Sequence, residues 1–145
     1  MMILGTANFG ASYGFEENSV SSQSKINEIL NIATKKNPCT IDTSESYGDS
    51  IRLLKNSGNS FKCIFKIPSD NLNNETNINL FIRNNNLLKI ETLMLHDVMN
   101  VDQLDNTKIF EKLLNYAEKK NIPNIGISVY SPKSAYDILK KYHFN

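Results

Sequence analysis

Four side chains that can hold or move a proton lie at or just beyond the ends of apolar runs in the sequence. They are one aspartate, one tyrosine, one lysine and one histidine, at Asp42, Tyr47, Lys66 and His96. Asp42, Lys66 and His96 each lie at or near the end of a short apolar run, and Tyr47 follows Asp42 in a polar loop. Together they form a candidate set for acid–base chemistry.

This combination of residue types suits the reduction of a carbonyl group, because that reaction creates an alkoxide that must be protonated. Tyr47 is the candidate proton donor, and the ammonium group of Lys66 would stabilise the phenolate that remains. Asp42 would balance the charge of Lys66, since a buried ammonium without a partner is costly. His96 would orient or polarise the carbonyl oxygen.

Each residue taken alone also has a structural interpretation. A strand-end aspartate often caps a turn, a lone lysine is usually solvated, and a single histidine is usually structural. A different chemistry is also open: Lys66 could form a Schiff base, because a lysine inside an apolar strand can have a depressed pKa. His143 is expected at the surface, and Glu45 has no predicted partner.

The elements that must position these residues alternate along the chain. Apolar runs predict strands at 2–6, 39–43, 61–67, 92–96 and 125–130. Apolar periodicity and capping signals predict helices at about 24–36, 50–57, 75–86, 107–120 and 132–142, with a loop at 98–105. Such alternation predicts βα units around a parallel sheet, in which the carboxyl ends of all strands share one edge.

The last two helices have predicted apolar faces of four or five residues each. The first face comprises Ile109, Phe110, Leu113, Leu114 and Ala117, and the second comprises Ala135, Ile138, Leu139 and Tyr142. Ser131 followed by Pro132 is a good helix start, because proline suits the first helical position.

Length and composition predict one domain over residues 1–145, since 40% of the residues are apolar and can form a core. The net charge of +1 and the lack of a basic face argue against nucleic acid or membrane partners. No apolar run reaches the roughly 18 residues of a membrane span, so a cytoplasmic protein is expected. Cys39 and Cys63 are predicted to be reduced core thiols; a disulfide or a metal pair is the alternative.

The four residues occur in the order of the catalytic tetrad of the aldo-keto reductases, and the chain resembles that family. The segment LGTANFG at 4–10 is similar to the family's opening Gly-Thr segment, and GIS at 126–128 is similar to its Gly-Val-Ser strand. The likeness runs from Ile3 to about Tyr142. It implies an α/β fold of the (β/α)8 TIM-barrel type that is incomplete, with about five βα units present.

The resemblance also implies a cofactor and its contacts. NADPH is expected, with NADH as an alternative, and no metal is expected. Gly5 and Thr6 match a segment that approaches the cofactor, Asp42 is expected to touch the ribose, and Ser128 matches the residue whose hydroxyl holds the carboxamide. Val129 stands where the family often has Asn, so one side-chain hydrogen bond is expected to be missing.

A complete (β/α)8 barrel typically needs about 250 residues, and this sequence has 145. The chain is therefore expected to be the N-terminal part of a carbonyl reductase acting on a small-molecule substrate. The alternative is a truncated, catalytically inactive remnant or an interaction module. Five units would leave two open sheet edges, so self-association through these edges is a further expectation.

Overall fold

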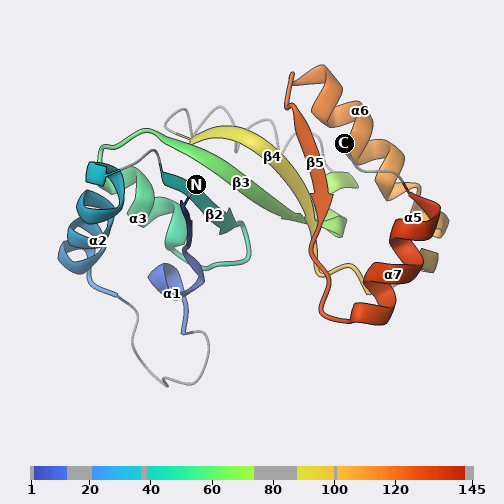
Figure 1. The fold of residues 1–145 in the computed structure, drawn as a ribbon, viewed down its shortest axis with the longest axis horizontal. Helices are drawn as coiled ribbons and strands as arrows, with labels where there is room; N and C mark the ends of the chain where they lie inside the picture. The colour runs from blue at the N-terminus through green and yellow to red at the C-terminus, as the bar shows by residue number, and fades with distance from the viewer. Residues whose placement is uncertain (1, 13–20, 37–38, 74–87, 100, 143–145) are drawn as a thin grey trace.

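The computed structural model describes residues 2–12, 21–36, 39–73, 88–99 and 101–142. Five strands form one parallel sheet whose order follows the chain (Figure 1). They are β1 (Met2–Gly5), β2 (Cys39–Ser44), β3 (Phe61–Pro68), β4 (Leu88–His96) and β5 (Asn124–Ile127). A doubly wound sheet reverses its strand order at a switch point, whereas a (β/α)8 barrel keeps the sequential order. The observed order is that of the predicted incomplete barrel.

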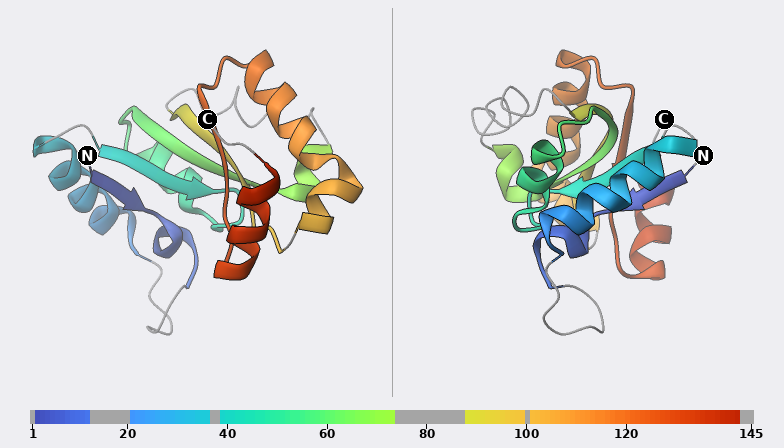
Figure 2. Two further views of the ribbon diagram at one scale, coloured as in Figure 1. Left: turned by 45° about the vertical axis from the view of Figure 1, so that its right-hand side comes forward. Right: turned by 90° about the vertical axis from the view of Figure 1, so that its left-hand side faces the viewer.

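Helices connect the strands and form two groups, one near the first strands and one near the last strand (Figure 2). α2 and α3 lie near the first strands, and α5, α6 and α7 lie beside β5 (Figure 1). The α-helices are α1 (Ala7–Gly10), α2 (Gln23–Lys36), α3 (Ser50–Asn56), α5 (Val101–Thr107), α6 (Ile109–Lys119) and α7 (Pro132–Lys141), and η1 (Ser69–Asn73) is a 3-10 helix.

The structure corrects several predicted elements. The predicted loop at 98–105 is wrong, because α5 begins at Val101 and buries Leu104. α1 and η1 were not predicted, since a single helical turn is too short to display an apolar period. β4 begins earlier than predicted, and β5 ends at Ile127. The helix predicted at 75–86 lies outside the described residues.

The side chains of each strand alternate between two faces of the sheet. The helix-covered face forms the core with fully buried apolar residues: Ile41, Cys63, Phe65, Ile67, Leu93 and Leu95, together with Ile26 and Leu30 from α2 and Ile109 and Leu113 from α6. Cys39 and Cys63 are buried, unbridged thiols within this core, as predicted. The opposite face carries Asp42 and Ser44 of β2, Lys66 of β3 and His96 of β4.

The buried stripe of α6 runs through Ile109, Leu113 and Tyr116. Leu114 was predicted to face inward but is 42% exposed, because it lies one position outside this stripe. Leu139 was also predicted to face inward and is 61% exposed, whereas its neighbour Ile138 is fully buried.

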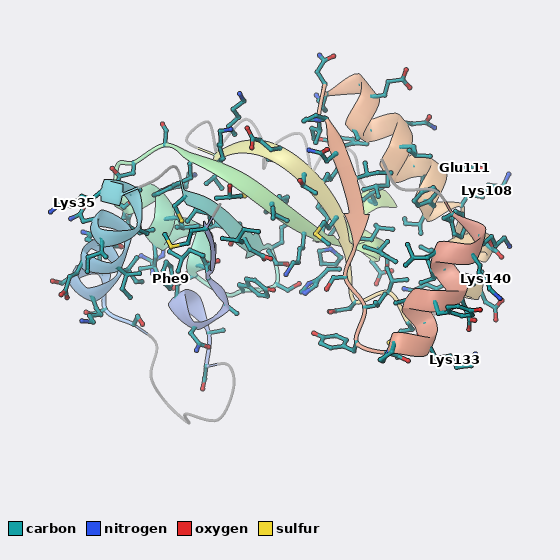
Figure 3. All side chains as sticks on the ribbon, in the orientation of Figure 1. Phe9, Lys35, Lys108, Glu111, Lys133 and Lys140 are labelled. Atoms are coloured by element: carbon teal, nitrogen blue, oxygen red, sulfur yellow. The ribbon has the colours of Figure 1, made fainter. Side chains whose placement is uncertain are left out.

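Charged side chains occupy the outer surfaces of the helices. Figure 3 shows Lys35 on α2, Glu111 on α6 and Lys140 on α7 at the periphery of the molecule. Within the described part of the chain, no helix has the length and apolarity needed to cross a membrane.

Candidate active site

The strand register brings the predicted acid–base residues to one edge of the sheet. Ser44 on β2 pairs with Lys66 on β3, and Pro68 on β3 pairs with His96 at the end of β4. Asp42 lies two residues before Ser44 and therefore points to the same face. The structure thus gathers residues that are far apart in the sequence.

Lys66 connects two of the predicted residues. Its Nζ lies 2.9 Å from Oδ1 of Asp42 and donates a hydrogen bond of 3.2 Å to Oη of Tyr47. Burial lowers the pKa of Lys66, but its contacts with Asp42 and Tyr47 outweigh that effect and raise the pKa above its usual value. Lys66 is therefore an ammonium at neutral pH, and the phenolic hydrogen of Tyr47 stays available for donation.

The loop that presents Tyr47 is held by backbone contacts. The amide of Tyr47 donates to the carbonyl of Ser44, and the carbonyl of Tyr47 accepts from the amide of Ser50. Gly48 has φ +51°, and its own α-carbon comes so close to Gly10 that a Cβ would lie 2.4 Å from the Gly10 carbonyl oxygen. α1 therefore supports the loop through contacts that only glycines permit.

His96 is buried beside Tyr47, with 6% of its surface exposed. The two rings meet edge to face, with their centroids 5.6 Å apart. Nδ1 of His96 lies 3.2 Å from Oγ of Ser44, and Nε2 lies 3.3 Å from Oδ1 of Asp97. Burial is the largest cause of a lowered pKa at His96, although Asp97 acts in the opposite direction. The imidazole is therefore neutral at neutral pH.

A depression of about 290 Å³ opens next to Asp42, Tyr47 and Lys66, whereas His96 is not among its lining residues. Its lining comprises Gly5, Thr6, Ala7, Asn8, Asp42, Tyr47 and Lys66. The amide and the hydroxyl of Thr6 both donate to the carbonyl of Asp42, at 3.0 Å each, which ties the end of β1 to β2. A Cβ on Gly5 would meet nothing within 4 Å, so the glycine leaves open space beside the pocket.

Of the four predicted cofactor residues, Gly5, Thr6 and Asp42 line this pocket, whereas Ser128 does not. Ser128 follows β5 at the same edge of the sheet. Its amide donates to the carbonyl of Leu95, and its carbonyl accepts from the amide of Val98. It therefore flanks the segment that carries His96.

Three contacts at this edge were not predicted. Ser44 contacts His96, Asp97 contacts the other nitrogen of the same ring, and Asn71 donates a 2.6 Å hydrogen bond to Glu45. Ser44 could have been found from the sequence, because it shares a strand face with Asp42. The contact between Asn71 and Glu45 has no such signal, since it joins η1 to the loop after β2.

No family sequence model matches the chain, and a comparison with curated proteins finds no match. Two solved structures described as candidate aldo-keto reductases from Pseudomonas aeruginosa are similar to it, with TM-scores of 0.76 and 0.72 and 18% sequence identity in both cases. The chain shares their fold. The similarity covers 97% of this chain but only 60% and 58% of those two proteins. The predicted fold, an incomplete (β/α)8 barrel, is confirmed.

Proposed function

We propose that the chain is the catalytic part of an NAD(P)H-dependent reductase of the aldo-keto type, acting on a small aldehyde or ketone. One observation carries the proposal: Lys66 contacts both Asp42 and Tyr47 beside a pocket at the carboxyl edge of the sheet. That edge is where barrels of this kind hold their reacting groups. The proposal includes a cytoplasmic location, which is compatible with the two unbridged thiols.

The residues of the chain divide the work as follows. Tyr47 donates its phenolic proton to the oxygen of the carbonyl that is reduced. The ammonium of Lys66 already donates a hydrogen bond to Tyr47 Oη, and it stabilises the phenolate that this transfer leaves. Asp42 balances the positive charge of Lys66. His96 holds the same carbonyl oxygen through a hydrogen bond. A reduced nicotinamide, when bound, supplies the hydride.

The pocket is compatible with such a group in part. At about 290 Å³ it lies just below the roughly 300–1,000 Å³ of typical ligand cavities. It therefore suits a nicotinamide ring beside a carbonyl group and not a whole dinucleotide. Gly5, Thr6 and Asp42 would hold the cofactor there, and the open space at Gly5 favours close approach of a flat ring. Ser128 would hold the carboxamide from the far side of the sheet edge.

The alternative hypothesis, in which Lys66 forms a Schiff base with the substrate, has less structural support than the reductase proposal. A lysine nucleophile must be a neutral amine, and the contacts of Lys66 raise its pKa. The inactive alternative keeps one observation in its favour, since the chain spans about 60% of the length of the proteins whose fold it shares. Self-association is a further proposal, motivated by Met2 and Ile3, which are 45% and 48% exposed on β1.

The test is a fluorescence titration of the purified chain with NADPH, followed by assays of NADPH oxidation with a generic aldehyde. Tyr47→Phe is expected to lower kcat by about 10²–10⁴-fold. Tyr136→Phe is the matched control, because Tyr136 is 58% exposed on α7 and its ring contact with Lys140 survives the change. Unchanged reduction by Tyr47→Phe would overturn the proposed acid.

The competing readings give other outcomes. NADPH binding without oxidation, or no binding by a chain that circular dichroism shows to be folded, favours the inactive alternative. Trapping of a carbonyl substrate on Lys66 by borohydride would support the Schiff base instead. Sedimentation over a range of concentrations tests self-association.

A further inference from the structure

The hydroxyl of Ser44 lies where the ends of β2, β3 and β4 meet, although the proposed proton transfer assigns it no part. The side chain is fully buried. Its Oγ lies 3.2 Å from Nδ1 of His96, 3.2 Å from the carbonyl oxygen of Lys66 and 3.1 Å from the amide nitrogen of Ser46.

We propose that Ser44 is a positioning residue that holds the imidazole of His96 by donating to Nδ1. This keeps the ring in the tautomer protonated at Nε2. Nε2–H then faces Asp97 in the structure and becomes the donor to a carbonyl substrate that displaces this exposed carboxylate. The inference rests on the proposed function for the identity of that substrate, whereas the tautomer itself is independent of it.

The first step is a count of hydrogens around Ser44. A serine hydroxyl has one hydrogen to donate and can accept two hydrogen bonds. The amide of Ser46 is a donor and takes one of the accepting positions. The carbonyl of Lys66 can only accept, so it competes with Nδ1 of His96 for the single hydrogen of Ser44.

The other side of the imidazole indicates which ring nitrogen carries the proton, and so whether Nδ1 needs a donor. Nε2 of His96 lies 3.3 Å from Oδ1 of Asp97, and a carboxylate can only accept. A lone pair on Nε2 would face that anion and be repelled, so the proton belongs on Nε2. Burial lowers the pKa of His96 and favours an imidazole with a single proton. Nδ1 then carries the lone pair, and the Ser44 hydroxyl is the donor that satisfies it.

Removal of this hydroxyl would leave Nδ1 buried without its donor. An unsatisfied buried acceptor is costly, so the ring would change tautomer or turn. Either change removes Nε2–H from the position facing Asp97, which is the position that the proposed substrate oxygen would take. The contacts of Tyr47 with Lys66 would stay, because Ser44 does not touch either side-chain end group.

The direct test is the imidazole nitrogen spectrum of the 15N-labelled chain. The sequence has two histidines, so a His143→Gln variant assigns the signals of His96. The wild-type chain is expected to have His96 protonated at Nε2, and Ser44→Ala is expected to show a mixture of tautomers or a shift to Nδ1–H. Thr43→Val is the matched control: Thr43 is equally buried, and its hydroxyl contacts Ser50 instead.

Two outcomes would overturn the inference: a wild-type His96 protonated at Nδ1, or a Ser44→Ala chain that keeps the wild-type tautomer. The tautomer of His96 in the wild-type chain tests the inference even if Ser44→Ala does not fold. Activity gives a second readout, in which Ser44→Ala lowers kcat about tenfold in the wild-type chain and has no further effect in a His96→Gln chain. A chain without any reductase activity would refute the proposed function and leave the tautomer result to decide the role of Ser44.

Discussion

The ammonium group of Lys66 lies 2.9 Å from Oδ1 of Asp42, where β2 and β3 run side by side. The two side chains are 14% and 25% exposed, so both charges are largely removed from water. Among the residues described, Oδ1 of Asp42 has no aligned hydrogen bond beyond this ion pair. Each of these two partly buried charges is therefore stabilised mainly by the other.

Asp42→Asn is expected to lower the free energy of unfolding by about 1–3 kcal/mol, because it leaves a buried ammonium without a counter-charge. Glu28→Gln is the control, since it breaks an ion pair with Lys25 in which both side chains are about 60% exposed. That change is expected to cost at most about 0.5 kcal/mol. Urea denaturation at neutral pH measures both values, and equal losses would contradict the dependence of the Asp42–Lys66 pair on burial.

Gly48→Ala is expected to destabilise the chain and to disturb the loop that presents Tyr47. The new Cβ would lie 2.4 Å from the carbonyl oxygen of Gly10, a backbone atom that cannot move aside cheaply. Gly58→Ala controls for positive φ alone, because Gly58 has φ +71° with nothing within 4 Å of its Cβ position. The control is expected to cost about 1 kcal/mol, and Gly48→Ala at least about 1 kcal/mol more. A Gly48→Ala chain as stable as the control would show that α1 does not constrain this loop.

His96 is expected to make the chain less stable at acidic pH. Its folded-state pKa lies below the ordinary value of 6.5, mainly because the ring is buried, so the unfolded chain binds more protons as the pH falls through that value. Stability is therefore fully present above about pH 6.5 and decreases below it. Unfolding free energies at pH 7.5 and 5.5 should differ less in His96→Gln than in the wild type. His143→Gln should keep the wild-type difference, and an equal pH difference in His96→Gln would refute the assignment.

Cys63 is expected to resist thiol reagents in the folded chain. Burial, with a smaller effect from the charge of Asp42, raises the pKa of Cys63 to about 12, so little thiolate exists at pH 8. In a Cys39→Ser chain the single remaining thiol should react with a chromogenic disulfide only as fast as the chain opens, and immediately in concentrated urea. Rapid reaction without urea would mean that the core around Cys63 is open to solvent.

Much of the fold could be predicted from the sequence, because its signals are local. The alternation of apolar runs with helical periods indicates βα units, and parallel strands bring their carboxyl ends to one edge. The types and order of Asp42, Tyr47, Lys66 and His96 therefore pointed to one site before any distance was known. The start of α7 was also predicted correctly, since Ser131 accepts a hydrogen bond from the amide of Ser134.

The tertiary structure alone decided which atoms meet at that site. The hydroxyl of Ser44 reaches Nδ1 of His96 only because β2 and β4 both pair with β3 in a particular register. The close approach of Gly48 to Gly10 and the burial of Tyr116 in place of Leu114 depend likewise on how separate segments pack. Local propensity says where a strand or helix lies, whereas the rotation of a helix and the distance between two side chains follow from packing across the whole chain.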